Sequence, residues 1–106
     1  MKEIVYNKLV RDRIPEIIRA DGKECETEVL EDSAFLAALD KKMTEELQEY
    51  FGSHSAEELA DLLEVIYAAA DVLGYSREQL EELRVRKAEK CGGFGQKIFL
   101  KTVREL

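Results

Sequence analysis

Two stretches of helical periodicity between residues 42 and 72 place acidic side chains on the faces that should be buried. Glu46 and Glu49 stand three residues apart in the first stretch, and Glu58 and Asp61 repeat this spacing in the second. Residues three and four apart share one face of an α-helix. The apolar residues that share a face with Glu46 are Phe35, Leu39, Met43 and Tyr50. Those that share a face with Glu58 are Leu62, Val65, Ala69 and Val72. If both faces are buried, the fold places carboxylates beside its core.

Carboxylates in such positions require a nearby cation. An ionised carboxylate without a partner costs several kcal/mol in an apolar interior, even after the protein relaxes. Lys42 is the one lysine close to these faces. Mg²⁺ fits the donors better, because it binds oxygen ligands, keeps some water and commonly shares its coordination with substrate phosphates. Facing helices often build carboxylate sites of this kind, so we predict a divalent-metal site here.

Two simpler interpretations compete with the metal site. A chain with 23 Asp and Glu residues produces acidic pairs three apart by chance, and such pairs usually form a solvated face. Ser55 and Glu58 also have the spacing of a capping box, in which the glutamate side chain folds back to the start of its own helix.

Length and composition limit the possible classes of protein. A chain of 106 residues suits one domain with a modest core; a buried metal cluster in so small a protein indicates an oligomer. The net charge of −7 disfavours nonspecific nucleic-acid binding, which depends on a basic surface. No apolar run approaches the roughly 18 residues of a membrane span, and the first residues run straight into charge. We therefore expect a cytoplasmic protein with no membrane partner.

Turn and cap residues divide the chain into elements. Pro15 predicts a short helix that ends at Asp21 and Gly22. Alternation of polar and less polar residues predicts a strand near 25–30, and the best partner for it is the segment 96–101. The long helix from Asp32 is expected to end at Phe51, where Gly52 stops it.

Two further helices follow the long one. The third should run from Ala56 to Leu73, with Gly74 in a left-handed conformation after its end. Ser76 and Gln79 then cap a fourth helix, which Gly92 and Gly93 close. The expected fold is all-α: a bundle of about four helices completed by oligomerisation, with a small two-stranded ribbon. No linker or repeat divides it, so residues 1–106 form one domain.

Basic residues gather in two places. Lys8, Arg11 and Arg13 form a patch near the N-terminus, while Arg84, Lys87 and Lys90 share a face of the fourth helix. The helical set is either a solvated face or a phosphate clamp. The N-terminal set either ties the chain to the acidic helices or contacts a phosphate.

Motifs along essentially the whole chain resemble one family, the MazG-like and phosphoribosyl-ATP-pyrophosphatase-like nucleotide pyrophosphohydrolases. They are the run from Tyr6 to Ile18, the Glu-Glu-x-x-Glu run from Glu45 to Glu49, the Glu-Leu-Ala-Asp run from Glu58 to Asp61, and Gly92-Gly93-Phe94. The resemblance implies an all-α homodimer or homotetramer that hydrolyses a nucleoside triphosphate to the monophosphate and pyrophosphate. The Mg²⁺ ligands it implies are Glu46, Glu49, Glu58 and Asp61. The interval between Glu49 and Glu58 is shorter than in many relatives, which predicts a tight turn between the two helices.

The resemblance also leads to a hypothesis about the reaction. A water attacks phosphorus in line with the pyrophosphate leaving group, and Glu45 or Glu49 orients that water. The residues expected to bind substrate phosphates are Lys8, Arg11, Lys87 and Lys90.

Two alternatives to this function remain open. Phosphoribosyl-ATP pyrophosphohydrolase cleaves the same bond in a different nucleotide. A non-catalytic helical module for dimerisation or partner binding would place its acids in water and its apolar stripes against another chain.

Overall fold

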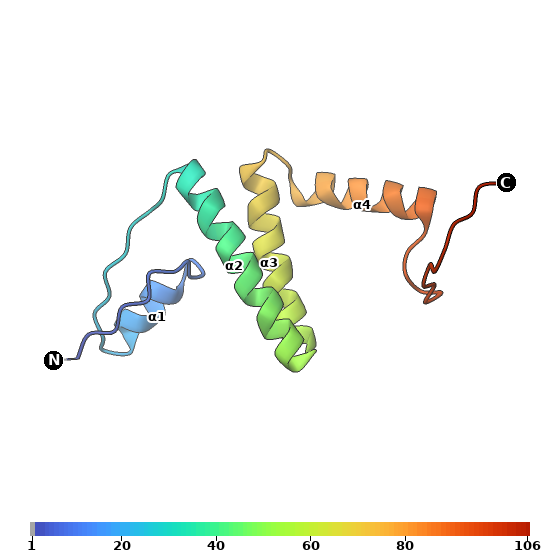
Figure 1. Cartoon of the computed structure of the whole chain (residues 1–106). Coiled ribbons are helices and arrows are strands. Elements are labelled where there is room, and N and C mark those ends of the chain that lie inside the picture. Colours follow the sequence, from blue (N-terminus) through green and yellow to red (C-terminus); the bar gives the residue numbers. More distant parts are fainter. Residues whose placement is uncertain (1) are drawn as a thin grey trace.

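The computed structural model describes residues 2–106, and every regular element in that range is an α-helix (Figure 1). The four helices are α1 (Ile14–Ala20), α2 (Asp32–Ser53), α3 (Ala56–Val72) and α4 (Arg77–Cys91). The prediction of an all-α protein with about four helices is therefore confirmed. None of these helices combines the length and the apolar character needed to cross a bilayer.

Helices α2 and α3 form an antiparallel hairpin at the centre of the molecule (Figure 1). The turn depends on His54, which has a left-handed backbone (φ 51°) and donates its N–H to the Tyr50 carbonyl at 2.7 Å. Helix α2 was predicted to end at Phe51, but it continues through Gly52 to Ser53. The prediction was wrong because Gly52 keeps a helical conformation and the left-handed position falls two residues later. The tight turn between α2 and α3 is confirmed.

Local capping residues set the ends of α3 and α4. Gly74 follows α3 with φ 91°, as predicted from its position. A complete capping box starts α4: the Ser76 side chain accepts from the Gln79 N–H at 3.1 Å, and the Ser76 N–H donates to Gln79 Oε1 at 2.8 Å. Helix α4 then projects away from the hairpin and meets α3 only near their shared corner (Figure 1).

The chain is extended for its length. Its radius of gyration is 18.9 Å and it measures 71 × 31 × 22 Å, whereas a compact domain of this size has a radius of about 13 Å. The buried apolar side chains of the described residues are Leu39 and Ala70, which are 3% and 7% exposed. Both belong to the α2–α3 hairpin. One copy of the chain therefore buries little beyond the contact between these two helices.

The predicted ribbon of residues 25–30 and 96–101 is absent from the described part of the chain. Both segments have irregular backbone, and they lie on opposite sides of the hairpin (Figure 1). A strand needs a neighbour for its backbone hydrogen bonds. The direction of α4 carries the second segment away from the first, so the ribbon prediction was wrong for a single chain.

Two glycines give a test of these helix ends. Gly52→Ala should stabilise the protein by about 0.5–1 kcal/mol, because an added Cβ meets nothing within 4 Å and alanine favours a helix. Gly74→Ala should destabilise it by about 1 kcal/mol, because φ is 91° there. Urea unfolding of both variants measures the two free energies. Stabilisation by Gly74→Ala would show that the corner after α3 has a different backbone.

Candidate acidic metal centre

Five carboxylates meet where α2 and α3 approach their turn, and we call them the acidic cluster. They are Glu45, Glu46, Glu49, Glu58 and Asp61. The side-chain oxygens of Glu45, Glu46 and Glu49 lie within 4.8 Å of one another, and so do those of Glu46, Glu58 and Asp61. Glu46 belongs to both groups. The structure thus brings together all the acidic residues that the sequence singled out.

Glu46 is the buried centre of the acidic cluster. Its residue surface is 7% exposed, and it is the one buried charged residue among residues 2–106. Its Oε1 atom lies 3.3 Å from Lys42 Nζ, but Oε2 has no hydrogen-bond partner. Glu58 Oε2 is likewise buried without a partner. Unsatisfied buried oxygens cost free energy, and an all-oxygen donor set matches the ligand preference of Mg²⁺. The residues present therefore fit a hard divalent cation.

Burial changes the acidity of Glu46. Desolvation raises the pKa of this carboxyl above its usual range; the Lys42 ammonium lowers it, and the neighbouring Glu49 raises it again. The net pKa is raised. The single lysine does not compensate fully for burying an acid beside another acid.

The capping alternative for Glu58 can be tested directly in the structure. Ser55 Oγ accepts from the Glu58 N–H at 3.3 Å, so half of the motif is present. The reciprocal bond is missing, because the Ser55 N–H donates to Ser53 Oγ at 3.3 Å. The Glu58 side chain is therefore not used as a cap and instead faces Glu46 and Asp61.

The outer part of the acidic cluster is solvated and contacts an N-terminal arm, which we define as residues 2–13. Arg11 Nη2 donates to Asp61 Oδ1 at 2.7 Å, and Lys8 Nζ lies 3.9 Å from Glu45 Oε1. Lys42 Nζ is also 3.5 Å from Glu45 Oε1. Lys8 and Arg11 thus lie at the site, as predicted, and the interpretation that they tie the chain to the acidic helices describes their present contacts. Lys42, the one lysine that the sequence places close to these faces, pairs with Glu46 at the i,i+4 spacing, although it was not predicted as a site residue.

Lys87 and Lys90 do not reach the acidic cluster within one chain. They occupy the distal half of α4, which starts at the end of α3 opposite the cluster (Figure 1). The helical period fixes a face of α4 but not its direction in space, so a phosphate-binding role for these two lysines stays a prediction.

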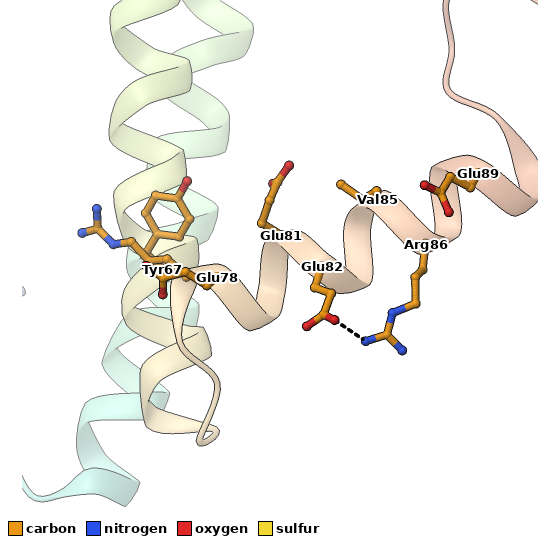
Figure 2. Close-up of a pocket in the computed structure, with 8 residues that line it drawn as sticks. Tyr67, Glu78, Glu81, Glu82, Val85, Arg86 and Glu89 are labelled. Carbon is orange, nitrogen blue, oxygen red and sulfur yellow. Dashed lines mark ion pairs between the residues drawn. The ribbon is translucent and has the colours of Figure 1, made fainter.

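A hollow lies elsewhere, in the corner between α3 and α4 (Figure 2). It has a volume of about 700 Å³ and is wide open. Its lining residues are Tyr67, Arg77, Glu78, Glu81, Glu82, Val85, Arg86 and Glu89. Arg77 stacks 4.4 Å from the Tyr67 ring and pairs with Glu64 at 3.1 Å, while Arg86 pairs with Glu82 at 3.4 Å. The lining holds four glutamates and two arginines, and this excess of negative charge disfavours an anionic ligand, so the corner is a poor nucleotide site.

Comparisons with known proteins do not assign the chain to a family. No family model matches the chain, and no solved structure matches it. An uncharacterized protein of Mycolicibacterium smegmatis (strain ATCC 700084 / mc(2)155) is 52% identical over 42 residues, which are 40% of this chain and 43% of that protein. The matched segment thus spans less than half of either protein.

The raised pKa of Glu46 gives a stability prediction for metal-free protein. Because the folded state binds this proton more tightly than the unfolded state, Glu46 weakens folding as the pH rises above its ordinary pKa of 4.5. Glu46→Gln should therefore raise the melting temperature at pH 8, by about 4–8 °C if the gain is about 1 kcal/mol. The gain should shrink toward pH 4.

The matched control is Glu45→Gln. Glu45 is a third exposed and pairs with Lys8 and Lys42, so its loss should leave the melting temperature unchanged or slightly lower. Thermal unfolding in EDTA across this pH range measures both variants. A clear drop in melting temperature for Glu46→Gln at pH 8 would contradict the assignment of Glu46 as an under-compensated buried acid.

Proposed function

We propose that the protein is a Mg²⁺-dependent nucleoside triphosphate pyrophosphohydrolase of the house-cleaning type. It would hydrolyse the bond between the α- and β-phosphates and release a nucleoside monophosphate and pyrophosphate. The observation that carries the proposal is the buried Glu46, with an unpartnered oxygen at the centre of five carboxylates and cationic side chains at their edge. The family resemblance of the motifs supports the same reaction.

Glu46, Glu49, Glu58 and Asp61 would hold the cation. When bound, Mg²⁺ supplies positive charge that neutralises the phosphate oxygens and aligns the triphosphate. The buried oxygens of Glu46 and Glu58 would then gain the partner that they lack. The resulting gain in free energy supports cation binding at this place rather than at the solvated acids elsewhere on the chain.

Glu49 is the better candidate for orienting the attacking water. Glu45 already forms ion pairs with Lys8 and Lys42. No ion pair within residues 2–106 engages Glu49. In this mechanism Glu49 accepts the proton of the water that attacks the α-phosphorus, and pyrophosphate leaves on the opposite side. Lys8 and Arg11, at the edge of the cluster, would pair with the phosphates.

A homodimer or homotetramer is part of the proposal. Leu47, Phe51, Leu59 and Leu63 are each between 38% and 59% exposed. Each of these four residues directly follows, in sequence, a residue that faces the other helix of the hairpin. Successive residues are about 100° apart around a helix, so each of the four points to one side of this contact. Because the helices are antiparallel, both offsets point to the same side of the hairpin. The N-terminal arm contacts Glu45 and Asp61, which lie one position before contact residues and therefore on the other side. The apolar side is thus available to a second copy.

A second copy would also explain how Lys87 and Lys90 could act at the site. In one chain they are far from the acidic cluster (Figure 1). We therefore assign them a phosphate-binding role only across a subunit contact, as part of the proposed oligomer.

A non-catalytic dimerisation module is the second candidate, and the extended shape is compatible with it. A chain with a radius of gyration of 18.9 Å and a bare apolar hairpin face has the features of an assembly module, whether or not it catalyses a reaction. In that case the acidic cluster would have no chemical role. The two candidates therefore differ in what mutation of Glu46 does.

The test is pyrophosphate release from a panel of nucleoside triphosphates and phosphoribosyl-ATP, measured with Mg²⁺ and with EDTA. Wild type should release pyrophosphate only with Mg²⁺, and Glu46→Gln and Asp61→Asn should each lower kcat/KM by at least about 100-fold. Phosphoribosyl-ATP as the best substrate would select the histidine-synthesis enzyme instead.

Glu57→Gln is the matched control for this assay. Glu57 is an exposed acid in the first turn of α3 and lies outside the acidic cluster. The Glu57→Gln variant should therefore be as active as wild type. If folded wild type releases no pyrophosphate from any nucleotide and binds no Mg²⁺, the enzyme proposal fails and the dimerisation module takes its place.

A further inference from the structure

The N-terminal arm places a cation on a carboxylate that the proposed function assigns to metal. Arg11 Nη2 lies 2.7 Å from Asp61 Oδ1, although the two residues are 50 positions apart in sequence. This is a tertiary ion pair between the arm and α3. Lys8, three residues earlier, lies 3.9 Å from Glu45 on α2. The arm therefore bridges both helices through their acids.

The Arg11 guanidinium and a divalent cation would compete for the Asp61 carboxylate. Both are attracted to the same carboxylate, and they repel one another at this range. The arm does not provide hydrogen-bond partners for the buried oxygens of the site. Glu46 is 7% exposed, and its Oε2 atom lacks a partner, as does Glu58 Oε2. The site thus has the Arg11 guanidinium on its solvated edge, while two buried carboxylate oxygens inside it lack a partner.

We propose that Arg11 is the resident counter-cation of the metal site, and that binding of a divalent cation displaces it from Asp61 and releases the N-terminal arm. The inference rests on the proposed function, because it requires that the acidic cluster binds a divalent cation. It assigns Arg11 a positioning role that changes with cation occupancy. Released from Asp61, its guanidinium is free to pair with an anionic triphosphate.

The arm has few other contacts that would hold it in place. Leu9 is the one half-buried side chain in residues 2–13, and the others are exposed. The backbone turns at Asn7, where φ is 46°. The Arg11 and Asp61 side chains are 58% and 42% exposed, so their pair is weak enough to be exchanged. Loss of the Arg11 contact would leave mainly Lys8 and Leu9 to hold the arm.

Two measurements on the full chain test the proposal. Mg²⁺ affinity is measured by calorimetry at low ionic strength for wild type, Arg11→Met and Arg13→Met. Arg13 pairs with Glu16 of α1 at 3.4 Å, so its substitution removes the same charge without freeing Asp61. Arg11→Met should tighten Mg²⁺ binding by about two- to fivefold, the range expected for an exposed ion pair. Arg13→Met should change it less.

The second measurement is the ¹⁵N heteronuclear NOE of the amides of residues 5–11. In wild type these values should fall when Mg²⁺ saturates the site, and in Arg11→Met they should be low already without Mg²⁺.

The outcomes separate this inference from the proposed function. If Mg²⁺ binds all three proteins equally and leaves the order of the arm unchanged, the inference is overturned and the metal site stands. If Mg²⁺ binds none of them, the proposed function fails together with the inference. Tighter binding in Arg11→Met alone, with release of the wild-type arm, supports both.

Discussion

The contact between α2 and α3 is the interaction on which the rest of the structure depends. It contains the two buried apolar residues of the described chain, Leu39 and Ala70, and also the buried carboxylate of Glu46. An interface this small has little apolar contact to offset a buried charge. The acid at its centre must therefore be neutralised by protonation, by Lys42 or by a bound cation. The N-terminal arm and the solvated acids of the cluster surround this carboxylate.

Local features of the fold were predictable because their causes are local. The Ser76 and Gln79 pair and the left-handed Gly74 follow from residues within a few positions of each helix end. The end of α2 was missed by two residues, since His54 adopts the left-handed conformation that glycine usually provides. The ribbon failed for a different reason: strand pairing of 25–30 with 96–101 depends on the direction of α4, which no local pattern encodes.

The same distinction applies to the site. Helical spacing placed Glu46, Glu58 and Asp61 on facing sides, and a tight turn was enough to bring them within 4.8 Å. The pair between Arg11 and Asp61 spans 50 positions, so charge patterning indicated a basic patch without its partner. Lys87 and Lys90 share a helix face as predicted, yet a face alone says nothing of the distance to α2.

Helix α4 has a consequence for how the molecule opens. It contains no buried residue. It is stabilised by contacts within the helix, namely the Glu81–Arg84 and Glu82–Arg86 ion pairs and the capping box of Ser76 and Gln79. Such local contacts each contribute only about 0.2–0.5 kcal/mol and weaken in salt. In an isolated chain, α4 is therefore a separate unit of local unfolding that opens at low free energy while the hairpin remains folded. Its hydrogen-exchange protection would report directly on whether another surface covers it.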